Sequence, residues 1–257
     1  MKKIEIGTEF PRHFQSLYPE EFSLFSHLET ASSIPSVLFA ITTWKENGRP
    51  NICFHAWSSF CGEPGSFHAV LGNLYQHTHT YANILRERCF GLSFLPLSAY
   101  AQLVETITHN EAECDEFAAG GFTVQQARCI HAPLIAEAFL SMECTLKQTI
   151  DLSGNGRSAL VIGEVCHLWV EEAFAHGYAR HGEEGFMFLV PAPQDLQSGK
   201  ADRSAIATLR IEKVDVTIHS QPKPVKWKTK EIVFYLKANQ RLSGRYDLSG
   251  CLMSYFL

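Results

Sequence analysis

Two imidazoles and three hydroxyls crowd the stretch His77-Thr78-His79-Thr80-Tyr81, where a segment with helical spacing begins. The first turn of a helix exposes N–H groups without intrahelical partners and the positive end of the helix dipole, and both attract an anion. The hydroxyls of Thr78 and Thr80 add donors, and His77 or His79 adds partial positive charge. These residues could therefore bind a phosphate monoester. The alternative is that Thr78 or Thr80 is simply the N-cap of the helix, worth about 1 kcal/mol, with both imidazoles in solvent.

A second chemical candidate lies upstream, in residues 51–62, where a predicted strand ends in Trp57 and opens into small hydroxyl residues. Apolar contact could hold the face of a flat heteroaromatic ring there, while backbone N–H groups and the hydroxyls of Ser58 or Ser59 bind its edge. The alternative is a core tryptophan followed by a loop. About twenty residues separate the two candidates, on adjacent predicted elements. A ring site beside a phosphate site fits a flavin mononucleotide (FMN) pocket.

Several common catalytic motifs are missing from the chain. Its 257 residues contain no Gly-x-Gly-x-x-Gly, Walker A, His-Glu-x-x-His or Gly-x-Ser-x-Gly motif. Their absence disfavours Rossmann, P-loop, zincin and α/β-hydrolase enzymes. The net charge of −5, with no basic run, also disfavours nucleic acid as a partner.

Histidines and cysteines raise the question of a metal site. The closest pairs in the sequence are Cys53 with His55, Cys129 with His131, and His176 with His181. None has the paired short spacing of a structural zinc site, so no metal is predicted. The eight cysteines are expected to be reduced core thiols of a soluble, cytoplasmic protein. The chain shows no signal-peptide pattern and no stretch of about 20 apolar residues that could span a membrane.

Strands are the main elements expected to position these residues. Continuous or alternating apolar patterns predict strands over 36–44, 51–57, 66–72, 89–95, 140–150 and 158–170. Asn47-Gly48 predicts a hairpin turn between the first two, since both residues tolerate positive φ. Gly163 predicts a bend in the last strand. Long bent strands joined by hairpins indicate a closed barrel rather than an open sheet.

Helices are predicted between the strands, starting near Thr78 to Thr80 and covering 98–109 and 115–119. Weaker patterns after Gly177 predict strands near 214–218 and 231–236. Because no stretch has linker composition, a single domain over 1–257 is expected. Its core would occupy 30–172, with a C-terminal elaboration over 177–257.

The order of several short motifs resembles the flavin reductase-like family of FMN-binding split β-barrels, in particular its flavoredoxin-like members. The pattern Asn51-x-x-x-x-x-Trp57 is followed by a strand and by Thr80-Tyr81-x-x-Ile84. Further matches follow in sequence order: Asp115-x-Phe117-Ala118, Gly121-Phe122-Thr123, Ala132-Pro133-Leu134-Ile135-Ala136-Glu137, Glu143-Cys144 and Ile162-Gly163-Glu164-Val165. The resemblance covers roughly residues 30 to 172, and its specificity lies in the order and spacing of the motifs.

This resemblance implies a mainly β protein, an antiparallel Greek-key split β-barrel with a few peripheral helices, that forms a homodimer with one FMN per subunit near the interface. By resemblance, the isoalloxazine and ribityl portions would be held by Asn51, Trp57, Ser58, Ser59 and Phe60. The phosphate would be held by Thr78, His79 and Thr80. The family differs from this chain at three places, where relatives carry an arginine before the phosphate-site threonine, a lysine in Asp-Lys-Phe and a histidine in Gly-x-His. Here these are His79, Glu116 and Ser158, and Arg157 is expected to supply the missing charge.

The implied activity is that of an oxidoreductase that passes electrons from NADH or NADPH through FMN to a flavin or a redox protein. Hydride transfer needs no catalytic acid or base from the protein, and none is predicted. Two alternatives remain open. One is an FMN-carrying electron-transfer protein that does not meet the nicotinamide, and the other is a barrel that has lost its flavin and acts as a binding module.

Overall fold

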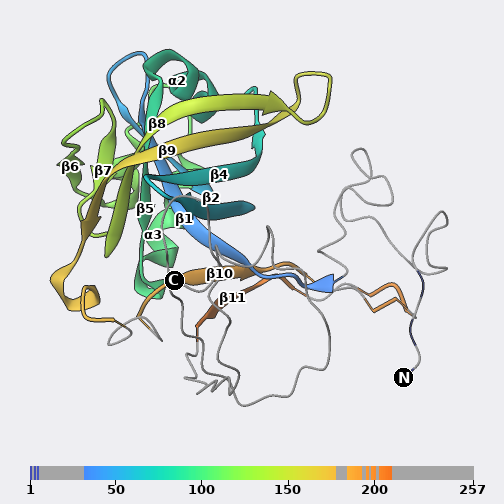
Figure 1. Cartoon of the computed structure of the whole chain (residues 1–257). Helices are drawn as coiled ribbons and strands as arrows, with labels where there is room; N and C mark the ends of the chain where they lie inside the picture. Colours follow the sequence, from blue (N-terminus) through green and yellow to red (C-terminus); the bar gives the residue numbers. More distant parts are fainter. Residues whose placement is uncertain are drawn as a thin grey trace, which may run out of the picture. The chain divides into compact units, whose positions relative to one another are not determined.

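Antiparallel strands dominate the computed structural model (Figure 1). It describes residues 32–177, 184–192, 195–196, 198–200 and 203–209, together with residues 1, 3 and 5. Within these ranges no helix is both long enough and apolar enough to cross a membrane.

Nine strands form the main sheet: β1 (Ser36–Trp44), β2 (Pro50–His55), β3 (Ser58–Glu63), β4 (Ser66–Tyr75), β5 (Cys89–Phe94), β8 (Leu140–Asp151), β9 (Ser158–Val170), β10 (Met187–Val190) and β11 (Ala205–Thr208). Their hydrogen-bonded order is β11-β10-β1-β5-β8-β9-β4-β3, and β2 pairs with β1. Since β2 pairs with β1 and leads directly into β3, which pairs with β4, the chain itself connects the β1 side of this array to its β3 end. The predicted mainly β split barrel is therefore confirmed, and Figure 1 shows the long β8–β9 hairpin beside β4.

Each strand predicted between 36 and 170 has a counterpart, but the turn after β1 differs from the expected one. Lys45 N donates to Arg49 O at 2.8 Å, and Gly48 N donates to Lys45 O at 3.0 Å. In the turn, Gly48 has a positive φ of 79° and Asn47 does not. The predicted hairpin is present, and of the two residues that tolerate a positive φ only Gly48 adopts one. A longer loop with one left-handed glycine provides the reversal.

The strand predicted over 51–57 ends earlier than expected, and the following residues are a strand rather than a loop. Trp57 adopts a φ of 64°, which breaks β2 from β3. Gly72 N donates to Trp57 O at 2.8 Å, and a Cβ on Gly72 would lie 2.4 Å from that oxygen. A glycine is thus required where β4 passes this kink. Ser58 and Ser59 belong to β3, which the sequence did not reveal because most of its side chains are exposed and follow no apolar alternation.

The predicted helices are present as α2 (His79–Glu87), α3 (Tyr100–Thr108) and α4 (Glu116–Gly120), with a 3₁₀ turn η1 (Leu97–Ala99) before α3. The side chain of Asp115 accepts from Ala118 N at 2.9 Å and caps α4. Two short strands, β6 (Val124–Gln126) and β7 (Pro133–Ile135), pair with each other and were not predicted. A second 3₁₀ turn, η2 (Glu172–Phe174), follows β9.

Aromatic side chains fill the barrel, including the fully buried Phe39, Phe90 and Phe139. The register of β9 against β8 shifts beside Gly163, the residue at which the sequence predicts a bend. A Cβ on Gly163 would lie 2.4 Å from Cζ of Phe90, so the glycine makes room for this ring.

The cysteine expectation needs correction. All seven cysteines of the described residues are free thiols, but Cys61, Cys129 and Cys166 are exposed, and only Cys89 and Cys144 among the seven are buried.

Cys251 and the strands predicted near 214–218 and 231–236 lie outside the described residues. Strands β10 and β11 were not predicted. The single-domain organisation over 1–257 stays a prediction.

Candidate functional site

A cavity of about 420 Å³ lies where β2, the start of α2, the end of α3 and the start of α4 come together. Its lining consists of Asn51, Ile52, Cys53, Phe54, His77, Thr78, His79, Thr80, Thr106, Ile107, Asn110 and Glu116. Four residues predicted from the sequence to bind a cofactor, Asn51, Thr78, His79 and Thr80, are therefore in one cavity.

The helix start confirms the N-cap interpretation of Thr78. Its hydroxyl accepts from Tyr81 N at 3.3 Å and donates to Tyr75 O at 2.7 Å. The next two amides, those of His79 and Thr80, have no hydrogen-bond partner among the residues that the structure describes. The cap uses one amide of the first turn and leaves those of His79 and Thr80 without a partner in the described residues, so it does not conflict with the predicted anion site.

Thr80 lies deeper than the other residues of the helix start. It is buried, and its hydroxyl accepts from Asn51 Nδ2 at 3.0 Å. Burial raises the pKa of the neighbouring Cys53 thiol to about 11, while a hydrogen bond with Thr80 opposes this rise. Asn51, Thr80 and the neutral thiol therefore form a polar, uncharged part of the cavity wall.

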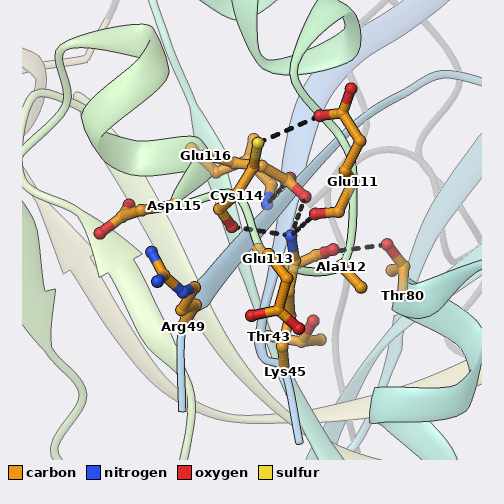
Figure 2. A network of polar contacts seen from close by, with 12 residues as sticks. Thr43, Lys45, Arg49, Thr80, Glu111, Ala112, Glu113, Cys114, Asp115 and Glu116 are labelled. Atoms are coloured by element: carbon orange, nitrogen blue, oxygen red, sulfur yellow. Dashed lines mark hydrogen bonds and ion pairs between the residues drawn. The ribbon is translucent and has the colours of Figure 1, made fainter. Parts of the chain in front are cut away.

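A buried ion pair includes another residue of the cavity lining, Glu116 (Figure 2). Lys45 Nζ lies 2.8 Å from Glu116 Oε1, and the two side chains are only 5% and 1% exposed. The same ammonium donates to the carbonyl oxygens of Glu111 at 2.8 Å and Cys114 at 2.9 Å. Burial raises the pKa of Glu116, whereas Lys45 and the Ile52 amide lower it.

The Glu116 carboxylate also binds the free edge of a strand. Ile52 N donates to Glu116 Oε2 at 2.6 Å, so this amide points away from β1 and toward α4. The ion pair thereby ties residues 111–116 to both β1 and β2. Sequence reasoning singled out Glu116 as a departure from the family pattern and missed Lys45, because a lysine beside a hairpin turn ordinarily is solvent-exposed.

Among the residues predicted to hold the ring and the ribityl chain, Asn51 lines this cavity, whereas Trp57, Ser58, Ser59 and Phe60 do not. Trp57 is half-buried at the kink, and Ser58 Oγ donates to Ala56 O at 3.3 Å. Ser59 is exposed on β3. Phe60 packs in the barrel, with its ring 5.6 Å from the rings of Phe39 and Phe94. The chain from Asn51 to Phe60 therefore leads from the cavity wall into the barrel core.

Arg157 lies in the β8–β9 turn, close to the chain that precedes α2. Its carbonyl oxygen accepts from Gln76 N at 3.0 Å, one residue before His77. Its own amide donates to Ser153 Oγ at 2.9 Å. The turn is thus attached to the chain just before the segment predicted to bind phosphate, although Arg157 is not part of the cavity lining.

His55, at the end of β2, is buried with its Nε2 atom unpartnered among the described residues. Burial lowers its pKa to about 4, against a hydrogen bond with the Gly72 backbone that raises it. The side chain is therefore neutral at neutral pH. In the part of the chain that the structure describes, no three His, Cys, Asp or Glu side chains are grouped in a way that could hold a metal ion.

Comparison with known proteins places this geometry in context. The family model described as "Flavin reductase like domain" matches residues 31–184. No curated protein sequence matches significantly. Among solved structures, component B of nitrilotriacetate monooxygenase from Bacillus cereus superposes with a TM-score of 0.61 at 18% identity, covering 79% of this chain and 98% of the other.

Two further structures share the fold. Flavoredoxin of Desulfovibrio vulgaris (Miyazaki F) has a TM-score of 0.52 at 20% identity and covers 70% of this chain and 90% of its own. The NADH:FAD oxidoreductase of Streptomyces globisporus C-1027 has a TM-score of 0.51 at 14% identity and covers 74% of this chain and 98% of its own. At these identities the likeness concerns the fold.

Proposed function

Since the chain belongs to the flavin reductase-like domain family, we propose that it is an FMN-binding oxidoreductase whose cofactor phosphate occupies the cavity beside α2. The observation that carries the proposal is the meeting of Asn51, Thr78, His79 and Thr80 in one cavity at a helix N-terminus with two unpartnered amides. Amides, hydroxyls and imidazoles are the donors that a phosphate monoester needs.

The chain's own groups would divide the binding work. The amides of His79 and Thr80 bind the phosphate, and Asn51 and the Thr80 hydroxyl orient the adjoining polar chain of the cofactor. Trp57, Ser58 and Ser59, further along the same segment, are proposed to contact the ring, and Arg157 to add positive charge from the β8–β9 turn. When bound, the flavin supplies the redox chemistry, so that the protein contributes position and electrostatics.

The proposed electron path runs from NADH or NADPH to a free flavin or a redox protein. The structurally similar NADH:FAD oxidoreductase supports this direction, since its name states both the nicotinamide and a flavin. The structurally similar flavoredoxin favours a second candidate, an electron carrier that does not meet the nicotinamide. A homodimer, as the family resemblance implies, is part of the proposal.

Two measurements test the proposal. The purified protein, or the protein incubated with FMN, is expected to show flavin absorption, and stopped-flow mixing with NADH or NADPH is expected to bleach it on a catalytic timescale. Bound flavin that neither nicotinamide reduces would leave the electron carrier. A colourless protein that takes up no FMN would reject both and leave the barrel as a binding module.

A further inference from the structure

Building on the proposed function, we infer that His77 and His79 are specificity-determining residues that read the phosphate of the flavin, so that the preference for FMN over riboflavin depends on pH. Both imidazoles line the cavity and both are exposed. They flank the N-cap Thr78, one directly before it and one as the first residue of α2. The ring of His77 stacks on Tyr75, with centroids 5.5 Å apart and planes at 24°.

The other charged groups around the cavity are already balanced or remote. Glu116 also lines the cavity and interacts electrostatically with His79, but its carboxylate is paired with Lys45. The Lys45 ammonium is buried and is held by one carboxylate and two carbonyl oxygens. Arg157 reaches the neighbourhood through its backbone contact with Gln76 and is not in the lining.

The remaining wall residues bring no positive charge. The Cys53 thiol stays protonated because burial raises its pKa to about 11. Asn51, Thr106 and Asn110 are uncharged. Within the described residues, the imidazoles of His77 and His79 are therefore the lining groups that can add positive charge next to a bound phosphate.

The sign of the pH effect follows from the two partners. Histidine side chains as a class gain a proton and a positive charge between about pH 8 and pH 5. A phosphate monoester changes from dianion to monoanion near pH 6. Attraction between a histidine side chain and a phosphate monoester is therefore strongest around pH 6 and weakens as pH rises. Riboflavin carries the same ring and ribityl chain without the phosphate, so the ratio of its dissociation constant to that of FMN isolates this attraction.

The test is a binding titration of the flavin-free full-length protein with FMN and with riboflavin, at about pH 6 and about pH 8.5 and low salt. The riboflavin-to-FMN ratio of dissociation constants is expected to be about tenfold larger at the lower pH, the scale of a charge-assisted hydrogen bond. The double variant His77→Gln/His79→Gln should lose this pH dependence and keep its riboflavin affinity. His176→Gln, an exposed position outside the cavity lining, is the matched control and should keep the dependence.

A further variant replaces one imidazole by a permanently charged side chain. His79→Arg is expected to hold the ratio high at both pH values. A ratio that is not larger at the lower pH in the wild type, or a larger ratio at the lower pH that survives in the double variant, would overturn the inference while leaving flavin binding intact. Failure of both flavins to bind at either pH would overturn the proposed function and the inference together.

Discussion

The ion pair between Lys45 and Glu116 is expected to be the polar contact on which both stability and the cavity wall depend most. In Lys45→Met the apolar stem is retained and the ammonium is removed, so one carboxylate oxygen and two carbonyl oxygens lose a buried partner. Removing one partner of a buried pair costs about 3 to 5 kcal/mol. This is a large part of the roughly 5 to 15 kcal/mol that keeps a domain folded.

Urea unfolding followed by tryptophan fluorescence measures the loss directly, as a change in the free energy of unfolding. Lys147→Met provides the matched control, because Lys147 pairs with Glu164 on the surface with side chains 50% and 31% exposed. Such exposed pairs contribute at most about 1 kcal/mol. The comparison therefore separates burial from the mere loss of a lysine.

A second substitution tests whether the cost of Lys45→Met arises from the stranded carboxylate. In Lys45→Met/Glu116→Gln the amide oxygen can still accept from Ile52 N, and no buried charge is left. This double variant should recover about 2 kcal/mol relative to Lys45→Met alone. A cost below about 1 kcal/mol for Lys45→Met, or a double variant less stable than the single one, would refute the reasoning.

Three further outcomes are expected. In a thermal melt, Gly72→Ala should destabilise the protein by about 1 to 3 kcal/mol, because its Cβ would lie 2.4 Å from the Trp57 oxygen. The control Gly62→Ala should cost less, because its Cβ meets only side-chain atoms of the exposed Phe67 within 3.0 Å. Burial lowers the pKa of His55 from 6.5 to about 4, so as pH falls the unfolded chain takes up a proton before the folded one does. The free energy of unfolding should therefore fall by about 3 kcal/mol as pH drops from 6.5 to about 4. His55→Gln should flatten the slope of unfolding free energy against pH, and an unchanged slope would contradict this. Thr80→Ala should weaken FMN binding by about 1 to 3 kcal/mol in a fluorescence titration, while exposed Thr108→Ala should leave it unchanged; equal affinities would mean that the phosphate binds elsewhere.

Patterns that depend on neighbouring residues were readable from the sequence. The alternation along 140–150 predicted β8, the hydroxyls at 78–80 predicted the start of α2, and Asn47-Gly48 predicted a hairpin. Strand β3 escaped notice because its pairing with β4, not its own side chains, makes it a strand. Its mostly exposed residues carry no apolar period that would mark it.

The candidate site could be predicted from the sequence only in part, because some of its contacts join segments that are far apart in the chain. Asn51 and Thr80 were predicted from motif order, and the structure joins them by a hydrogen bond. The pairing of Lys45 with Glu116 requires the loop after α3 to fold back onto the β1–β2 hairpin, and no local pattern encodes such a long-range approach. Burial of a charge is a property of the surroundings, which are fixed only once the chain has folded.

The hydrogen bond between Ile52 and Glu116 gives the molecule a natural probe of local opening. Amides within a barrel ladder exchange with deuterium when the barrel itself comes apart, whereas the Ile52 amide is protected by a carboxylate from another segment. Its exchange rate therefore follows detachment of residues 111–116 while the strands stay paired. A single backbone position thus distinguishes breathing of the cavity wall from global unfolding.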